Sequence, residues 1–135
     1  MNIVPYLNFD GNCREAFEFY REVLGGEEPS FYTNEDVPMD NLPAGMEDMV
    51  IHAQLTFEGQ TLMGCDNPTD WYEVPRSISV SIQLTDPDRA SKLFTALAEG
   101  GQVSMPWGEQ PWGAQFGMAT DRFGIPWMIN CEPAS

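Results

Sequence analysis

His52 is the only histidine of this 135-residue chain and its clearest candidate for acid–base chemistry. An imidazole can accept or donate a proton near neutral pH, so His52 could serve as a general base or a general acid. The competing interpretation is a structural histidine held by a hydrogen bond, since no partner residues are evident around it. A single histidine also means that one chain cannot build a metal site from several histidines.

Other polar residues alternate with apolar ones along segments that read as strands. Such alternation places the apolar set on a helix-covered face of a sheet and the polar set on the opposite face. In segment 77–84 the apolar set is Ile78, Val80, Ile82 and Leu84. The predicted ligand-binding residues of the opposite face are Tyr6, Asn8, Gln54, Ser79, Ser81 and Asn130, and they lie there with His52 and Gln83. A curved sheet would make this face a cup for a polar small molecule, whereas a flat sheet would expose it to water.

Trp107 is the remaining predicted ligand-binding residue. It stands between Pro106 and Gly108 in an expected loop over 107–113, where an aromatic side chain could close over a pocket. Packing in a core or across a dimer interface is the alternative.

The three cysteines argue against a disulfide framework or a zinc site. Cys13, Cys65 and Cys131 lie far apart and form no C-x-x-C pair. Such an arrangement is typical of a reducing compartment, and we expect a cytoplasmic protein. The acidic segment 34–48 lacks the regular ligand spacing of a calcium loop, so a solvated loop is expected there.

The charge balance excludes one class of partner. The chain has 21 acidic residues and 6 basic ones, and its net charge of −15 repels a nucleic-acid backbone. No apolar run is long enough to span a membrane, and no signal peptide is visible at the start of the sequence. The length fits a single domain over residues 1–135.

A duplicated order of elements must position these residues. Segment 3–9 reads as a strand that leads into a helix over 13–24, with Asn12 and Glu15 as a capping-box pair. Asp86 is expected to cap a second helix over 88–99 that follows strand 77–84. Further strands are expected at 29–33, 49–57, 60–64, 102–105, 115–120 and 125–131. Two sub-modules follow, about 1–66 and 77–135, joined by 67–76.

Several short motifs carry a resemblance to a known superfamily. They are Tyr6-Leu7-Asn8-Phe9-Asp10-Gly11-Asn12-Cys13, Ala16 with Phe19-Tyr20, Leu24-Gly25-Gly26, His52-Ala53, Leu62-Met63-Gly64, Trp112-Gly113 through Phe116-Gly117, Asp121-Arg122-Phe123-Gly124, and Trp127. Together with the duplicated order, they make the chain similar to the PhnB-like branch of the vicinal oxygen chelate superfamily. That superfamily includes glyoxalase I, bleomycin-resistance proteins and extradiol dioxygenases.

The resemblance implies an α+β fold in which two βαβββ modules form a curved, eight-stranded mixed sheet, with helices outside and a cavity inside. It also implies a homodimer. Metal-dependent relatives carry ligands on the first, fifth and last strands, and the matching positions here fall at Ile3 or Val4, at Ser79 and at Met128. These are poor ligands for a divalent cation, so no cofactor is predicted and a metal is disfavoured. Members of the branch are sometimes labelled as methyltransferases, but the sequence lacks a Gly-rich strand-to-helix turn for a nucleotide-like cofactor.

Three functions stay open at this point. The first is a small-molecule-binding protein without the superfamily metal. The second is a metal-dependent lyase, isomerase or dioxygenase with a non-standard site that uses His52 and carboxylates. The third is a structural or interaction module.

Overall fold

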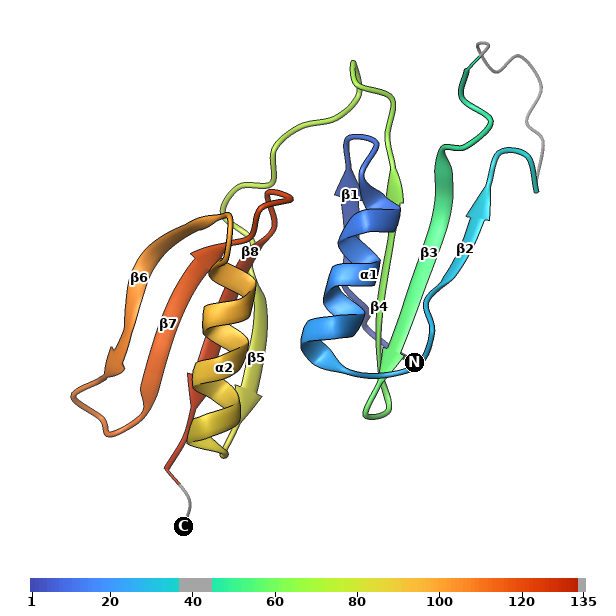
Figure 1. The fold of residues 1–135 in the computed structure, drawn as a ribbon. Coiled ribbons are helices and arrows are strands. Elements are labelled where there is room, and N and C mark those ends of the chain that lie inside the picture. The colour runs from blue at the N-terminus through green and yellow to red at the C-terminus, as the bar shows by residue number, and fades with distance from the viewer. Residues whose placement is uncertain (37–44, 134–135) are drawn as a thin grey trace. The chain divides into compact units, whose positions relative to one another are not determined.

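The order of strand, helix and three strands occurs twice in the computed structural model (Figure 1). The structure describes residues 1–36 and 45–133, and the chain divides into two units, Met1–Glu73 and Val74–Ser135. The elements of unit 1 are β1 (Tyr6–Phe9), α1 (Cys13–Leu24), β2 (Ser30–Thr33), β3 (Val50–Phe57) and β4 (Gln60–Asp66). Those of unit 2 are β5 (Val80–Leu84), α2 (Pro87–Ala98), β6 (Gln102–Glu109), β7 (Gln115–Thr120) and β8 (Pro126–Cys131).

Each unit contains one four-stranded mixed sheet. The strand order is β1-β4-β3-β2 in unit 1 and β5-β8-β7-β6 in unit 2. In both sheets the first strand is parallel to the last, and the other neighbours are antiparallel. The helix of each unit packs on one face of its own sheet, as Figure 1 shows, and leaves the other face open. The predicted α+β fold of two βαβββ modules is confirmed, with the eight strands divided between two open sheets.

The buried face of unit 1 is aromatic. Phe9, Phe17 and Tyr20 are fully buried, and their rings lie within 6.5 Å of one another. Phe17 packs on the backbone of β4 at Gly64, where a Cβ atom would lie 2.9 Å from its ring and 2.5 Å from the Leu7 carbonyl oxygen. No side chain fits between helix and strand at this position, so the glycine sets how closely α1 approaches β4.

The start of α1 differs from the expected capping box. Asn12 makes no side-chain cap hydrogen bond. The backbone N–H of Cys13 donates instead to Oδ1 of Asp66, at 2.9 Å, and the N–H of Val50 donates to Oδ2 at 3.1 Å. A buried carboxylate at the end of β4 thus ties the helix start to β3, and it satisfies the N–H group of Cys13, which has no partner within the helix. The predicted capping box of Asn12 and Glu15 is wrong, because the side chain of Asn12 makes no cap hydrogen bond and a carboxylate distant in the sequence contacts the helix start instead.

The start of α2 matches its prediction. Oδ1 of Asp86 accepts from the N–H groups of Asp88 and Arg89, at 3.1 and 3.3 Å, and Pro87 opens the helix. Phe94 of α2 packs over β7 at Gly117, where a Cβ atom would lie 2.7 Å from the ring.

Several strand limits differ from the sequence prediction. β1 begins only at Tyr6, after Pro5, which cannot donate a ladder hydrogen bond. β5 begins at Val80 because Ser77 has a positive φ of 61°, which breaks the extended run. Ile78, expected on the helix face, is 78% exposed as a result. β6 runs on to Glu109 through a segment expected to be a loop.

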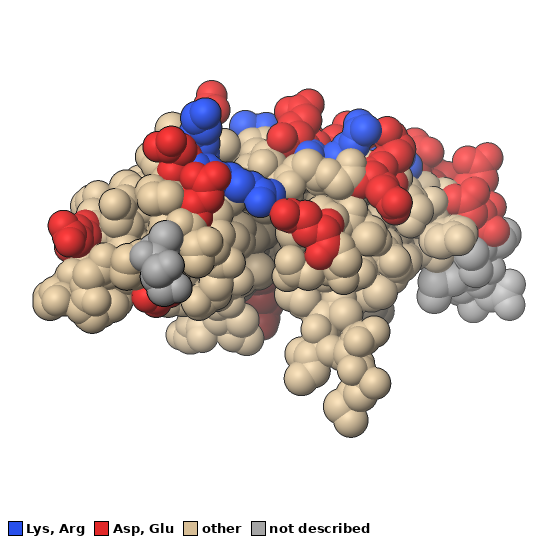
Figure 2. Space-filling view, turned by 90° about the horizontal axis from the view of Figure 1, so that it is seen from below, with Lys and Arg blue, Asp and Glu red and all other residues tan. Residues whose placement is uncertain are grey.

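Charged side chains are separated from the strands in both units. Among the strands, Asp66 and Glu109 are the acidic residues, and there is no Lys or Arg, whereas both helices carry charges of both signs. Figure 2 shows charged groups gathered over parts of the surface and large areas without any. Within the described ranges, no helix is long and apolar enough to cross a membrane. The acidic segment 34–48 lies partly outside the described residues.

Candidate functional site

The open face of unit 1 arranges its side chains in two rows that run across the four strands. Asn8 pairs with Cys65, and Tyr32 pairs with His52. β3 and β4 are antiparallel, and Ala53 pairs with Gly64. The next pair along the two strands therefore places His52 opposite Cys65. The Asn8 row is therefore Tyr32, His52, Cys65 and Asn8. The neighbouring Tyr6 row is Ser30, Gln54, Met63 and Tyr6.

His52 lies at the centre of this face, between two tyrosines. The ring centroids of Tyr6 and Tyr32 lie 6.0 and 6.5 Å from its own, and both tyrosines are about half exposed. The Tyr6 hydroxyl reaches Nδ1 of His52 at 3.4 Å, a long and therefore weak hydrogen bond. Three adjacent rings with polar edges form a surface on which a planar molecule can rest.

An amide and thiol network lies beside these rings. Oδ1 of Asn8 accepts from Nδ2 of Asn67 at 3.0 Å and from the thiol of Cys65 at 3.5 Å. We refer to the six residues Tyr6, Asn8, Tyr32, His52, Cys65 and Asn67 as the Tyr6–His52 patch.

The acidic groups of the patch hold their protons at neutral pH. Burial of its hydroxyl end, reinforced by Cys65, raises the pKa of Tyr6 from 10.0 to about 12, although its ring remains half exposed. Burial also raises the pKa of the Cys65 thiol, and the hydrogen bond from Tyr6 offsets part of that shift. Tyr6 and Cys65 are therefore neutral hydrogen-bond donors, and a thiolate nucleophile is disfavoured at this position.

The structure brings four of the predicted site residues together. Tyr6, Asn8, His52 and Gln54 share the open face of unit 1. Sequence reasoning missed Tyr32, Cys65 and Asn67. Alternation along β2 would have indicated Tyr32, and a strand extended past Gly64 would have indicated Cys65. Asn67 lies in a connection that carries no periodic signal.

The other predicted site residues belong to unit 2. Ser81 and Asn130 lie on its open face, where Asn130 donates to Gln83 at 3.4 Å and to Glu132 at 2.8 Å. Ser79 precedes β5. Trp107 lies in β6 with its ring 5.5 Å from that of Phe94 on α2, so it belongs to the helix side of its sheet.

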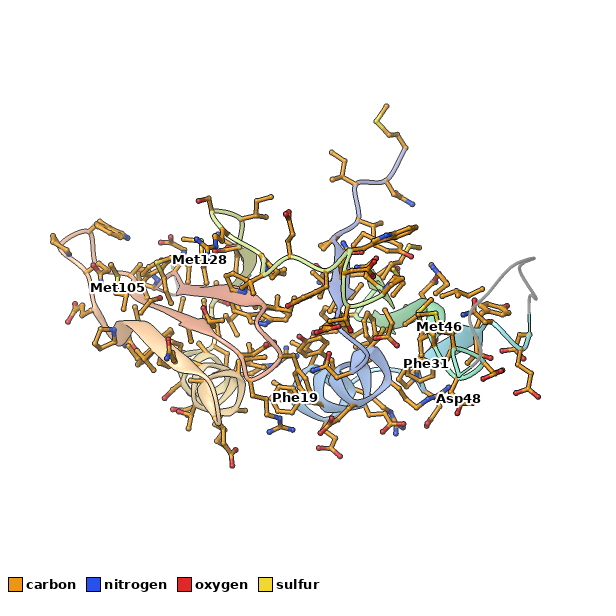
Figure 3. The ribbon with its side chains drawn as sticks, turned by 90° about the horizontal axis from the view of Figure 1, so that it is seen from above. Phe19, Phe31, Met46, Asp48, Met105 and Met128 are labelled. Carbon is orange, nitrogen blue, oxygen red and sulfur yellow. The ribbon has the colours of Figure 1, made fainter. Side chains whose placement is uncertain are left out.

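The open face of unit 2 also has two rows. The Gln83 row is Gly108, Phe116, Asn130 and Gln83. The methionine row is Met105, Met118, Met128 and Ser81. Figure 3 shows Met128 projecting from β8 away from α2, whereas Phe31 in unit 1 lies on the α1 side of its sheet.

The donor set does not match a divalent-metal centre. The matching positions offer Ile3, which is 95% exposed and lies before β1, or Val4, together with Ser79 and the thioether of Met128. Across the part of the chain that the structure describes, no three His, Cys, Asp or Glu side chains are grouped as a metal ion would need. The residues present therefore do not fit the ligand set of the metal-dependent relatives.

The family model described as 3-demethylubiquinone-9 3-methyltransferase matches residues 1–130. The chain belongs to this family. Its solved relatives include protein PA1353 from Pseudomonas aeruginosa, with a TM-score of 0.89 and 45% identity over 99% of both chains. A putative 3-demethylubiquinone-9 3-methyltransferase, PhnB protein, from Bacillus cereus has a TM-score of 0.74 and 25% identity over 98% of this chain and 100% of its own.

Family membership agrees with the wider fold. A member of the glyoxalase/bleomycin resistance protein/dioxygenase superfamily from Sphaerobacter thermophilus has a TM-score of 0.56 and 21% identity, over 98% of each chain. This third likeness concerns the fold alone. The family model and the PhnB protein from Bacillus cereus confirm the resemblance to the PhnB-like branch.

Proposed function

We propose that this protein binds a small molecule on the open face of unit 1, at the Tyr6–His52 patch. The observation that carries the proposal is the row register, which brings the only histidine between two half-exposed tyrosines. Half-exposed aromatic side chains keep unsatisfied apolar area that a planar ligand can cover. The network around Asn8 supplies fixed polar groups beside that area, the combination that is typical of small-molecule sites.

His52 is the proposed proton acceptor or donor of the site. Its Nδ1 faces the Tyr6 hydroxyl, so the two groups can share a proton with a ligand bound against both. No carboxylate is hydrogen-bonded to His52 in the described part of the chain, so binding is proposed as the primary function and catalysis is not required for it.

A thermal-shift screen of a metabolite library tests the proposal. A ligand that binds only the folded state raises the melting temperature by mass action. We expect hits with the wild-type protein, and we expect them to vanish in Tyr32→Ala. Tyr32 is 52% exposed on an edge strand, so its loss leaves the fold intact.

Met105→Ala is the matched control, since Met105 is 40% exposed on the edge strand of unit 2. Hits should persist in this variant. A library without hits would contradict the proposal, and so would hits that are lost in Met105→Ala and kept in Tyr32→Ala.

We also propose the homodimer that the resemblance implies. Light scattering on the purified protein measures its mass directly, and a monomer over the working concentration range would contradict this part of the proposal.

A further inference from the structure

The strands of unit 1 offer a ligand no permanently charged side chain. Their one acidic side chain is Asp66, which is buried and accepts two backbone N–H groups, and they contain no Lys or Arg. An ion that left water to lie on this face would lose hydration without gaining a permanent opposite charge. The net charge of −15 further repels anions at long range.

One donor of the patch, the side-chain N–H group of Asn8, has no partner among the described residues. Oδ1 of Asn8 accepts from Nδ2 of Asn67 and from the thiol of Cys65, and this arrangement leaves its Nδ2 group as the outward donor. Its Nδ2 group makes no hydrogen bond to the described residues and is exposed with the rest of the side chain. A donor in this position selects a ligand with an acceptor oxygen, because a ligand without one leaves the N–H unpaired once water is displaced.

The surface beside Asn8 is aromatic, and its rings are tilted to one another. The rings of Tyr6 and His52 are tilted by 40° to each other, and those of Tyr32 and His52 by 35°. A planar body can cover one tyrosine ring and still place its substituent over the Asn8 row.

We propose that the ligand is an uncharged, planar molecule with a carbonyl-type oxygen, held by stacking against the Tyr6–His52 patch and by a hydrogen bond from Nδ2 of Asn8. This inference rests on the proposed function and adds the chemical class of the ligand. It separates neutral amides, esters and quinone-like carbonyls from carboxylates and from cations of the same shape.

Three probes of nearly equal shape test the class: benzamide, benzoate and benzamidinium. They share a planar ring and differ in charge and in acceptor oxygen. His52 is the only histidine, so one imidazole signal in a heteronuclear NMR spectrum reports the site without assignment of the whole chain. We expect benzamide to shift that signal at millimolar concentration. Benzoate and benzamidinium should shift it at least about fivefold more weakly, because benzoate carries a charge and benzamidinium carries a charge and lacks an acceptor oxygen.

Asn8→Ala should weaken benzamide binding by about three- to tenfold, the effect of one lost neutral hydrogen bond. Gln83→Ala is the matched control, because Gln83 is the exposed amide on the first strand of unit 2, and it should leave benzamide binding unchanged. Tighter binding of either ion, an Asn8→Ala variant that binds like wild type, or three silent probes would each overturn the inference. The proposed function would survive those results if the metabolite screen still gave hits that depend on Tyr32.

Discussion

The two open faces use equivalent rows of the same strand order for unlike chemistry. The Asn8 row of unit 1 contains a tyrosine, a histidine and a thiol, whereas the Gln83 row of unit 2 contains a glycine, a phenylalanine and two amides. The Tyr6 row is mainly polar, but the methionine row places three flexible thioethers side by side. Unit 1 therefore carries an imidazole that can exchange a proton among neutral hydrogen-bonding groups, and unit 2 carries adaptable apolar groups.

The helix-covered faces differ much less. In both units a phenylalanine of the helix packs directly on a glycine of the sheet, Phe17 on Gly64 and Phe94 on Gly117. The buried faces must satisfy close packing, which limits the residue types that fit. The open faces carry no such constraint, so a duplicated backbone can keep its core and diverge in function. Three experiments test this contrast, and they are ordered by the size of the effect expected.

The helix caps should show the largest difference between the two units. Asp66→Ala leaves the N–H groups of Cys13 and Val50 buried without acceptors, and we expect a loss of about 4 kcal/mol in the free energy of unfolding. Asp86→Ala removes an exposed local cap and should cost about 1 kcal/mol. Asn12→Ala, which removes no cap, should stay within about 0.5 kcal/mol of wild type. Urea unfolding measures all three, and an Asn12→Ala loss as large as that of Asp86→Ala would disprove the remote cap.

The two packing glycines should respond unequally to alanine. At Gly64 the added methyl meets a backbone carbonyl as well as a ring, and we expect Gly64→Ala to cost about 3 kcal/mol. At Gly117 it meets only the Phe94 ring, which can move with α2, so Gly117→Ala should cost about 1 kcal/mol. Urea unfolding of both variants measures the difference. Equal losses in the free energy of unfolding would show that the backbone at Gly64 moves as easily as the ring at Gly117.

The titration of Tyr6 gives the smallest effect and concerns the patch itself. Its pKa is raised from 10.0 to about 12, so the folded protein retains the phenol proton longer than the unfolded chain does. The contribution of Tyr6 to stability is therefore present below pH 10 and falls as the pH rises towards 12. The ultraviolet phenolate signal that wild type shows and Tyr6→Phe lacks should develop near pH 12, with circular dichroism confirming that both remain folded. A difference that develops near pH 10 would show that the hydroxyl is solvated.

Much of the fold follows from local patterns in the sequence. The helix 13–24 and the exposed positions of Tyr6 and Asn8 along β1 are as predicted, because periodicity reports which face is buried. The predicted ends of strands are wrong where a single residue determines the end. The left-handed Ser77 shortens β5, and the run through Trp107 stays in β6 despite Pro106.

The candidate site was only partly predictable for a different reason. Alternation identifies a face, so Tyr6, Asn8, His52 and Gln54 could be assigned together. The contacts among them depend on register between strands, which the sequence of one strand does not contain. The roles of Cys65 and Asn67 beside Asn8 appear only once β1 is known to pair with β4, more than fifty residues away.

The carboxylate of Asp66 has a consequence for the order in which the chain acquires structure. α2 begins with acceptors two and three residues away, so it can form its first turn alone, whereas the first turn of α1 is completed by a group 53 residues further on. Contacts of such separation form late because the intervening loop must close first. During synthesis from the N-terminus, α1 therefore leaves the ribosome without its cap and acquires it only when β4 has emerged and paired. Both sheets need their first strand to pair with their last, but the start of α1 alone also depends on that pairing for its cap, whereas α2 has its cap from the beginning.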